Sequence, residues 1–592
     1  MKSEHSEDTI HKEVVIIGNG PSGIALSYML SGNVPYVVST SHPDEMLSAR
    51  LETAIGQCLI NADLEFLSSG LEGRSTNPIS LLVDALLQPC ADIGLEMDSL
   101  IEFRKDGKEI DHVVLGKGPP GGSWHKMDPQ ILTLSLGNWM SLPGLPFVSR
   151  DSGEKRAYAS SVANYYVQYV QKMGLSKYFN NNVSVTSIRP VAKAKRHSLE
   201  NSDKCDVNWV EKLNENDCLS MNGENTENKF KRNIISNALN YIWNRGNKTS
   251  YKCCKRPRED QMLHEQSPDR KIREIDLETD HSGEKSNLRY IQPCNLNILC
   301  DSNNSNFSSN WLRDKRSRDN SEVPSSYKVT ECRCGEDVNW MVETRDLENG
   351  TIRTYTCKYV VLASGCNDIP NKLSITMRSE PDWLVYDLRT LESRLDSKTG
   401  NCKTNKLDPV LVVGAGLSAA DAVIALRGRN VPVIHAFRNK SADLNRQLPE
   451  NMYPEYHKVH QMMQDGGSNY PLYSSYPEYT LNKLNEAKHT VTLSNRNGQQ
   501  VELKVSHIIV LIGSSPDLSF LPEEFNIAIK HNQPIDGKTN AVNIDKMNHR
   551  VRGYKNLFAV GTLAGDNFVR FIPGGALAVL SELCKKNEVD ET

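Results

Sequence analysis

The sequence predicts an α/β protein with two nested Rossmann-like domains and a long disordered insertion. Two glycine-rich turns, at residues 18–23 and 414–419, each follow a short apolar strand and precede a helical pattern. Between them, residues 191–327 are dense in charged residues, Asn and Ser, and lack strong signals of regular structure. A segment of that length and composition inside a compact domain favours disorder.

The first turn follows the apolar run 14–17 and has the spacing of a dinucleotide fingerprint. In such a turn the first glycine permits the sharp bend and the second lets the backbone approach a pyrophosphate. The third lets the helix pack closely on the strand, and the helix N-terminus faces the phosphates. The predicted contacts are Gly18, Gly20, Pro21, Ser22 and Gly23.

The second turn repeats this arrangement after the apolar run 410–413, with alanine in place of the third glycine. Its predicted contacts are Gly414, Gly416, Leu417, Ser418 and Ala419. One such pattern is weak evidence, but two in strand–turn–helix context imply two nucleotide sites. The usual pairing of two sites in one chain is FAD with NAD(P)H.

Elements before the insertion follow from periodicity. Residues 10–40 are predicted to form the first βαβ unit, and 44–112 to be inserted after it. Inside that segment Asn77 and Pro78 begin a helix whose apolar stripe is Ile79, Leu82, Val83 and Leu86. Strands at 113–115 and 183–188 flank a helix at 161–173.

After the insertion the pattern changes to strands. We expect strands at 340–344 and 351–357, joined by a hairpin turn at Asn349 and Gly350, then a central strand at 359–365. Further strands at 508–513 and 557–561 precede a helix that ends near 583. The predicted FAD domain comprises 10–190, 328–375 and 516–585; the disordered insertion is 191–327 and the NADPH domain 376–515.

Composition excludes several classes of protein. The chain has 592 residues, 38% of them hydrophobic, and a net charge of −4, which gives no argument for nucleic acid as a partner. No apolar run approaches the roughly 20 residues that span a bilayer, and residues 1–9 do not resemble a signal peptide. The 14 cysteines are scattered, and His457 and His460 lack a third ligand, so no metal site is predicted. We expect a cytoplasmic protein with reduced thiols.

Further motifs resemble those of flavin-dependent monooxygenases. Gly121, Gly122, Ser123 and Trp124 resemble the Gly-Gly-x-Trp element of these enzymes. Residues 361–365 and 511–513 resemble the strand ends that link their two nucleotide domains. Residues 557–561, which end at Gly561, resemble the C-terminal flavin motif.

A closer resemblance is to the oxidative stress-induced growth inhibitor family of animals. It is carried by residues 71–75, 120–125, 447–449, 453–463 and 512–522. That family is described as monooxygenase-like, with roles in growth restraint, cell death and cytokinesis. The resemblance implies FAD and NADPH as cofactors and a small molecule or protein side chain as substrate. It also implies possible regulatory protein partners and a midbody pool.

Two single residues are candidates within this scheme. Arg438 follows the strand at 431–437, where a guanidinium would pair with the 2′-phosphate of NADPH; the alternative is a solvated surface arginine. Asn138 corresponds to a polar residue that related enzymes place over the flavin; the alternative is a loop residue without a role. Basic runs at 255–258 and 313–318 allow a nuclear pool, although interleaved acids favour solvated charge.

The sequence also departs from the monooxygenase pattern. No acid for the FAD ribose follows Val37 and Val38, and Thr562 stands where an aspartate is usual, with Asp566 four residues later. The substrate-side Phe-x-Gly-x-x-x-His motif is missing, and no Cys-x4-Cys of a disulfide reductase follows the first turn. The alternatives to a monooxygenase are therefore a flavoprotein scaffold acting through partner binding and an NADPH oxidase that releases peroxide.

Overall fold

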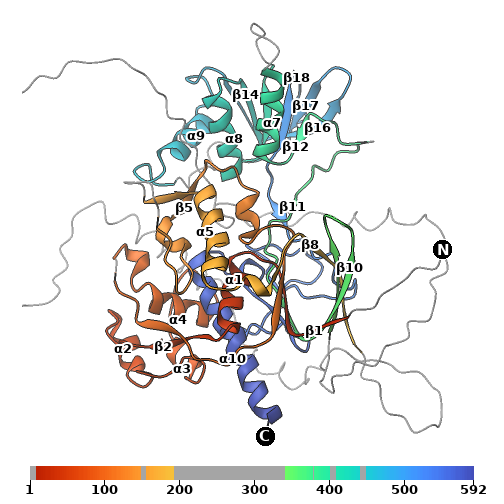
Figure 1. Cartoon of the computed structure of the whole chain (residues 1–592). Helices are drawn as coiled ribbons and strands as arrows, with labels where there is room; N and C mark the ends of the chain where they lie inside the picture. Colours follow the sequence, from red (N-terminus) through yellow and green to blue (C-terminus); the bar gives the residue numbers. More distant parts are fainter. Residues whose placement is uncertain are drawn as a thin grey trace, which may run out of the picture. The chain divides into compact units, whose positions relative to one another are not determined.

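The structure is a computed structural model that describes residues 9–95, 97–148, 155–191, 340–377, 379–399, 408–440 and 448–591. The predicted disordered segment therefore lies, apart from residue 191, outside the described residues, as do both basic runs and Gln447. Two sheets organise the rest, and the chain leaves the first sheet to build the second before returning (Figure 1). The fold is α/β with two Rossmann-like units, as predicted.

A seven-stranded sheet carries the first turn. Its order is β7-β4-β1-β10-β9-β8, and β21 also pairs with β10. The strands are β1 (Ile10–Ile17), β4 (His112–Leu115), β7 (Phe179–Asn180), β8 (Val183–Pro190), β9 (Trp340–Asp346), β10 (Ile352–Leu362) and β21 (Leu557–Ala559). The four strands nearest the turn, β4, β1, β10 and β21, run parallel.

The apolar run of β1 is buried on both faces of this sheet. Val14 and Ile16 pack into the core shared with the helices, while Val15 and Ile17 pack into a second core on the other face. The helices of the first core include α1 (Pro21–Leu30), α5 (Ala159–Lys172) and α10 (Ile572–Glu591). A continuous apolar strand is the pattern of a parallel sheet covered on both sides.

The predicted first βαβ unit is wrong in its second strand. The strand β2 (Asn33–Val37) pairs antiparallel with β3 (Ile101–Lys105) in a separate two-stranded sheet, and β4 takes the place beside β1. All four residues of β4 are buried, whereas two of the five in β2 are only half-buried. The strand with the more apolar surroundings therefore occupies the central position.

The inserted segment consequently begins at residue 33, not 44. Its two ends meet, since the Gly107 amide donates to the Gly32 carbonyl at 3.1 Å and the Ile110 amide to the Leu30 carbonyl at 2.9 Å. It contains α2 (Glu45–Leu51), α3 (Leu64–Ser68), α4 (Pro78–Leu87) and the 3₁₀ helix η1 (Ala91–Ile93). The helix predicted from the stripe at 79–86 is confirmed as α4, with all four stripe residues buried.

Other predicted helices are confirmed, and two of the predicted strands form a single strand. The helix predicted at 161–173 is α5, and its apolar face is buried, with Val162, Tyr165, Tyr166, Tyr169 and Val170 in the core. The strands predicted at 351–357 and 359–365 form one strand, β10, whose first half pairs with β9 and whose second half continues beside β1. The predicted closing helix extends beyond 583 as α10. Shorter elements are β5 (Leu132–Leu136), β6 (Arg156–Tyr158), η2 (Gly122–His125), η3 (Gly137–Met140), η4 (Ser176–Tyr178), η8 (Gly561–Ala564) and η9 (Val569–Phe571).

A five-stranded parallel sheet carries the second turn. Its order is β12 (Leu384–Val385), β19 (His507–Val510), β13 (Val410–Val413), β14 (Val433–Phe437) and β15 (Tyr473–Pro477). The helices α7 (Leu388–Thr399), α8 (Leu417–Gly428) and α9 (Pro454–Gln464) accompany it. A three-stranded antiparallel sheet joins β16 (Tyr479–Asn485), β17 (Thr490–Asn495) and β18 (Gln500–Lys504).

The chain enters and leaves this second unit side by side. The short strand β11 (Ile369–Pro370) pairs antiparallel with β20 (Ser514–Ser515), just before and just after it. The two-domain boundaries given above stay a prediction.

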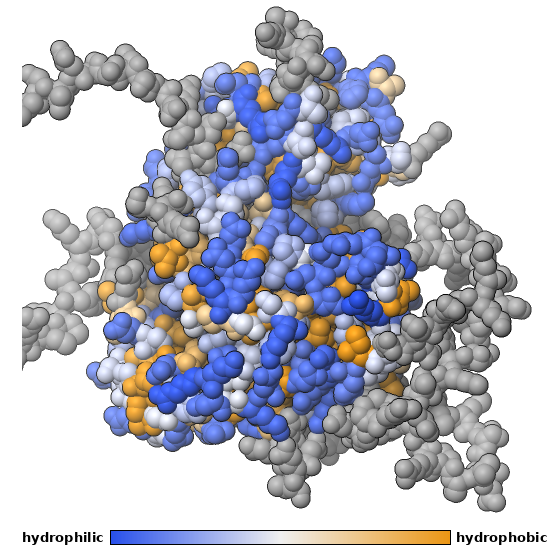
Figure 2. All heavy atoms as spheres, viewed as in Figure 1, coloured by the Kyte–Doolittle hydropathy of each residue, from blue (hydrophilic) through white to orange (hydrophobic). Residues whose placement is uncertain are grey.

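Among the described helices, none is long and apolar enough to cross a membrane. On the face in Figure 2, hydrophobic side chains gather where Figure 1 shows α2 and α3, whose exposed residues include Met46 and Phe66.

Candidate functional site

The three glycines of the first turn have different surroundings. Gly18 has φ +118° and lies against the backbone, because an added Cβ would come 2.3 Å from the Ala363 carbonyl oxygen. A Cβ on Gly23 would come 2.0 Å from the Gly18 carbonyl oxygen, so the helix packs tightly on the turn. A Cβ on Gly20 would meet nothing within 4 Å. The turn is therefore closed by two glycines and open at the second, where a pyrophosphate would approach.

The Gly-Gly-x-Trp element packs directly on this turn. The Gly121 amide donates to the Asn19 carbonyl at 2.9 Å, and a Cβ on Gly122 would lie 3.1 Å from Gly20 Cα. Gly121 and Gly122 both have positive φ, at 121° and 59°, which explains the residue type. Trp124 is buried in the core beside them.

The C-terminal motif reaches the same place from the other end of the chain. Gly561 has φ +68°, and a Cβ there would come 2.1 Å from Ser22 Oγ. Position 561 therefore requires glycine for a close approach to the start of α1. The predicted contacts Ser22 and Gly561, far apart in sequence, lie side by side.

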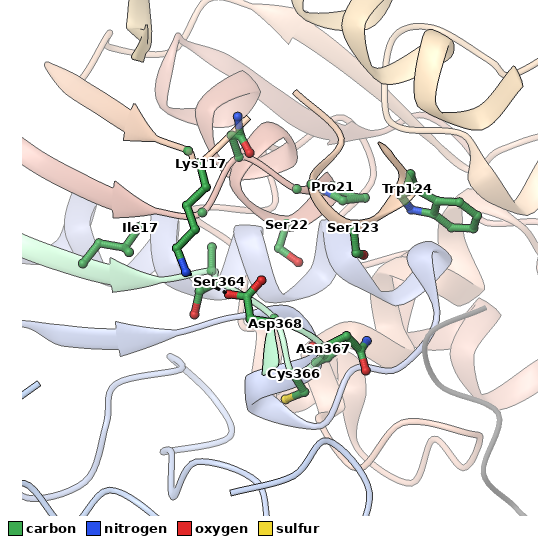
Figure 3. A pocket seen from close by; sticks show the side chains of 18 of the residues that line it. Ile17, Pro21, Ser22, Lys117, Ser123, Trp124, Ser364, Cys366, Asn367 and Asp368 are labelled. Atoms are coloured by element: carbon green, nitrogen blue, oxygen red, sulfur yellow. Dashed lines mark ion pairs between the residues drawn. The ribbon is translucent and has the colours of Figure 1, made fainter. Parts of the chain in front are cut away.

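The first turn, the Gly-Gly-x-Trp element and the residues that follow Gly561, beginning with Thr562, surround one cavity of about 290 Å³. The predicted contacts Gly23, Gly121 and Gly561 pack behind its wall and do not line it. Its lining includes Gly18, Gly20, Pro21, Ser22, Gly122, Ser123 and Trp124 from the predicted set. Figure 3 shows Pro21, Ser22, Ser123 and Trp124 from the two turns, and Ser364, Cys366, Asn367 and Asp368 from the segment after β10. Asn138 does not line this cavity; it is exposed on η3, while Ser135 and Met140 beside it do. A role for Asn138 stays a prediction.

The polar atoms of the cavity fit a large polar cofactor. Ser364 Oγ, Thr562 Oγ1 and Asn567 Oδ1 are buried and have no hydrogen-bond partner within the described part of the chain, and all three residues line the cavity. Buried polar atoms are nearly always satisfied, so unpaired ones point to a missing partner. None of these three residues was among the predicted contacts. The signal for Ser364 was its place at the end of a central strand.

Lys117 crosses the cavity to an acidic pair. Its ammonium lies 2.7 Å from Asp517 Oδ2 and 3.6 Å from Asp368 Oδ2, as Figure 3 shows for Asp368. Burial alone would raise the pKa of Asp517, but hydrogen bonds from Lys117 and Ser519 outweigh it and lower the pKa to about 2. Asp517 therefore stays ionised at neutral pH and forms an ion pair with the lysine.

Asp566 lines the cavity but is held by other groups. Ser75 Oγ donates to its Oδ1 at 2.6 Å and Ser80 Oγ to its Oδ2 at 2.8 Å. Burial raises the pKa of Asp566, against the opposing effects of His549 and of its hydrogen-bond donors. The Asn77 side chain does not cap α4 but donates to the Ala564 carbonyl at 3.0 Å. Ser75, in the stretch 71–75 that resembles the growth inhibitor family, thus helps to fix the segment that follows the C-terminal motif.

The second turn has the same steric design. Gly414 has φ +133°, and a Cβ there would come 2.2 Å from the Leu511 carbonyl oxygen, whereas a Cβ on Gly416 would meet nothing within 4 Å. Leu417, Ser418 and Ala419 form the first turn of α8. Arg438 is exposed directly after β14, the strand that pairs with β13. A cation at that position can reach a 2′-phosphate bound at the turn.

The geometry of the two glycine-rich turns agrees with comparisons to known proteins. Residues 317–553 match the family described as pyridine nucleotide-disulphide oxidoreductase. The chain is 34% identical over 589 residues to oxidative stress-induced growth inhibitor 1 of Mus musculus, covering 97% of this chain and 95% of that protein. It is 34% identical over 586 residues to inhibitor 2 of Homo sapiens, covering 96% and 92%.

The chain belongs to the oxidative stress-induced growth inhibitor family. The family match supports an oxidoreductase that binds flavin and a nicotinamide nucleotide. Among solved structures, a bacillithiol disulfide reductase from Bacillus cereus has 12% identity and a TM-score of 0.47, covering 97% of this chain and 99% of that one. A flavin monooxygenase from Stenotrophomonas maltophilia has 12% identity and a TM-score of 0.42, covering 97% and 100%.

The described residues include thiols but no metal-type cluster. Cys58, Cys90, Cys357, Cys366 and Cys584 are thiols there, not disulfides, and of these Cys366 lines the cavity. No group of three His, Cys, Asp or Glu side chains suited to a metal occurs among the residues searched, which are the described ones.

Proposed function

We propose that this protein is an FAD- and NADPH-dependent oxidoreductase of the monooxygenase type. FAD would bind at the first turn and NADPH at the second. When bound, the flavin supplies the chemistry, by accepting a hydride from NADPH and passing electrons to oxygen. The protein supplies binding, orientation and exclusion of water.

The observation that carries the proposal is the shared steric design of the two turns. In each, the first glycine is pressed against backbone and the second faces open space at the carboxyl end of a parallel sheet. Ligands bind at such strand ends in open α/β sheets. At the first turn the Gly-Gly-x-Trp element and Thr562, next to Gly561, complete the cavity, which a lone dinucleotide turn would not explain.

Three residues are proposed to hold polar parts of the flavin. Ser364 after β10, Thr562 in η8 and Asn567 between η8 and η9 present buried oxygen atoms to the cavity. At the second turn, Arg438 is proposed to select NADPH, because a guanidinium suits a phosphate and the next residues, Asn439 and Lys440, carry no acid. The substrate would be a small molecule or a protein side chain. The relatives' names favour a role in growth regulation under oxidative stress. A cytoplasmic location with midbody or nuclear pools is a further part of the proposal and does not rest on these names.

The test is spectroscopic and uses the purified full chain. We expect a yellow protein with a flavin absorption spectrum that NADPH bleaches in the absence of oxygen. On admission of oxygen, a monooxygenase of this type should recover its spectrum more slowly with NADP⁺ present than without it. Equally fast recovery with stoichiometric peroxide would instead identify an oxidase. A protein that neither carries nor binds added FAD would contradict the proposal and favour the scaffold.

A further inference from the structure

The residue that normally recognises the adenosine ribose is replaced in this chain. In a dinucleotide fold an Asp or Glu at the end of the strand next to the fingerprint strand hydrogen-bonds the ribose 2′-hydroxyl. The neighbouring strand here is β4, not β2: Ile17 pairs with Leu115, and the Gly18 amide donates to the Leu115 carbonyl at 2.8 Å. The residue at the ribose level is therefore Gly116.

Position 116 needs a glycine because of a neighbouring side chain and not because of its own backbone conformation. It is not among the glycines with positive φ, so an ordinary residue could adopt its conformation. A Cβ at 116, however, would come 2.0 Å from Asn19 Cγ and 2.1 Å from Asn19 Nδ2. The Asn19 carboxamide therefore occupies the space into which an acidic side chain at 116 would have to grow.

Asn19 is held firmly in that space. Its side chain lies within the cavity wall, and the residue is 4% exposed. Its Nδ2 donates to the Gly118 carbonyl at 2.6 Å and to Asn181 Oδ1 at 2.8 Å. These two bonds use both N–H groups of the carboxamide and leave Oδ1 as its acceptor.

The nearby carboxylates of Asp517 and Asp368 do not take the place of the missing ribose acid, because they form ion pairs. Lys117, the next residue, is paired with Asp517 and Asp368, and Asp368 also pairs with Lys126 at 3.1 Å. Ser519 donates to Asp517 Oδ1 at 2.7 Å as well. These carboxylates are engaged in ion pairs, whereas the Asn19 oxygen is next to the turn itself.

We propose that Asn19 takes the place of the ribose acid, with its neutral Oδ1 accepting the ribose hydroxyl of FAD in place of a carboxylate. This rests on the proposed binding of FAD at the first turn. Hydrogen bonds to a charged acceptor are about twice as strong as those to a neutral one. The ribose contact should therefore contribute less to flavin affinity here than in a fold that keeps the acid.

The arrangement can be tested by converting it to the usual one. We compare the full-length wild type with Asn19→Gly, Gly116→Glu and the double variant, by titrating flavin-free protein with FAD and following flavin fluorescence. Gly116→Glu alone should lose FAD affinity by at least about tenfold, because the new side chain collides with Asn19. The double variant should regain wild-type affinity or exceed it, because removal of the carboxamide gives the carboxylate room.

A second measurement isolates the ribose contact from general damage to the fold. ADP and 2′-deoxy-ADP compete with FAD for the adenosine half of the site, and their ratio of affinities reports the 2′-hydroxyl alone. For the wild type we expect a preference for ADP of about tenfold or less, as for a neutral hydrogen bond. For the double variant we expect roughly tenfold to hundredfold, as for a charged acceptor. For Asn19→Gly the preference should vanish.

The outcomes separate this inference from the proposed function. Failure of the wild type to bind FAD or ADP would overturn both. Binding by the wild type with an ADP preference that Asn19→Gly leaves unchanged would overturn only the role of Asn19. Loss of the preference in Asp517→Asn but not in Asn19→Gly would assign the ribose to Asp517 and also overturn it. Thermal unfolding of each variant, measured without ligand, shows whether a loss of affinity reflects loss of the fold.

Discussion

At the residue scale, the glycines of each nucleotide turn divide into those that the protein itself requires and those that a ligand would require. Gly18 and Gly23 lie against backbone atoms, so the fold excludes side chains there. Gly20 and Gly416 face open space, so the fold alone gives no reason for glycine. Glycine at such a position is explained by close approach of something that is not part of the chain.

This difference gives a paired prediction. Gly20→Val should abolish flavin retention while lowering the free energy of unfolding by about 1 kcal/mol or less, because a Cβ there would meet no protein atom within 4 Å and the main cost is a poorer N-cap of α1. Gly23→Val should cost about 3 kcal/mol or more, since its Cβ would collide with the Gly18 carbonyl oxygen. Flavin absorbance and urea unfolding of both variants check this. A Gly20→Val protein that still carries flavin would show that the cofactor lies elsewhere.

The choice of nicotinamide cofactor is also a matter of one residue. Arg438→Ala should weaken NADPH binding roughly tenfold to hundredfold, the loss of a charge-assisted phosphate contact, and leave NADH nearly unaffected. Arg496, exposed in the turn between β17 and β18, is a matched control whose replacement by alanine should change neither. Binding is measured by titration of the purified proteins. An equal loss for NADPH and NADH would make Arg438 structural.

At the scale of elements, each of the two sheets that carry a nucleotide turn contains a buried histidine in the strand next to the one that leads into the turn. His112 begins β4, where its Nδ1 donates to the Ile110 carbonyl at 2.7 Å and Ser27 Oγ donates to its Nε2 at 2.8 Å. His435 in β14 bonds the Gly414 carbonyl through Nε2 at 2.7 Å and the Tyr473 hydroxyl through Nδ1 at 2.9 Å. Burial lowers the pKa of each histidine to about 4, against the opposing effect of these carbonyl groups.

These strands should therefore make the protein sensitive to acid. Both histidines are neutral when folded but take up a proton near pH 6.5 when unfolded, so stability is complete above that pH and falls below it. Between about pH 6.5 and pH 5 the loss should approach about 2 kcal/mol for each histidine. Urea unfolding across this range checks it, and His112→Gln should reduce the pH dependence. The exposed His531 is the control, because His531→Gln should leave the pH dependence as in the wild type.

At the scale of the whole molecule, the long charged segment connects two strands that are already neighbours. In the antiparallel pair β8 and β9, Pro190 is opposite Trp340. The free energy of closing a loop grows only by about 0.6 kcal/mol for each doubling of its length. The strand pair therefore needs a connection, but not one of this length.

Shortening the connection should leave the nucleotide units intact. Replacing residues 195–325 by a short Gly/Ser linker should change neither the melting temperature nor the flavin content appreciably, because the paired strand ends remain in register. Differential scanning fluorimetry and flavin absorbance of the two purified proteins measure this. A marked loss of either would show that the segment contributes to the folded units.

The sequence by itself determined both nucleotide turns, the strands before them and the helices at α4 and α5. These features depend on local sterics and on the period of apolar residues, which are contained in short stretches of chain. For the same reason the close packing of the Gly-Gly-x-Trp element and of Gly561 could be anticipated from their glycines. The residue types that a tight backbone contact demands are visible before the partner is known.

Only the tertiary structure decided which strand lies beside β1, and with it which residue stands at the ribose level. The runs in β2 and β4 are both apolar and short, and the choice between them depends on how deeply each is buried in the assembled core. From the sequence, the acidic residue for the FAD ribose was expected after Val37 and Val38. In the structure the corresponding position is Gly116, and the Asn19 side chain occupies the space beside it. The same holds for Asp566, whose donors Ser75 and Ser80 come from the inserted segment. Contacts between distant segments arise from competition among many possible pairings, and no single stretch of sequence contains the outcome.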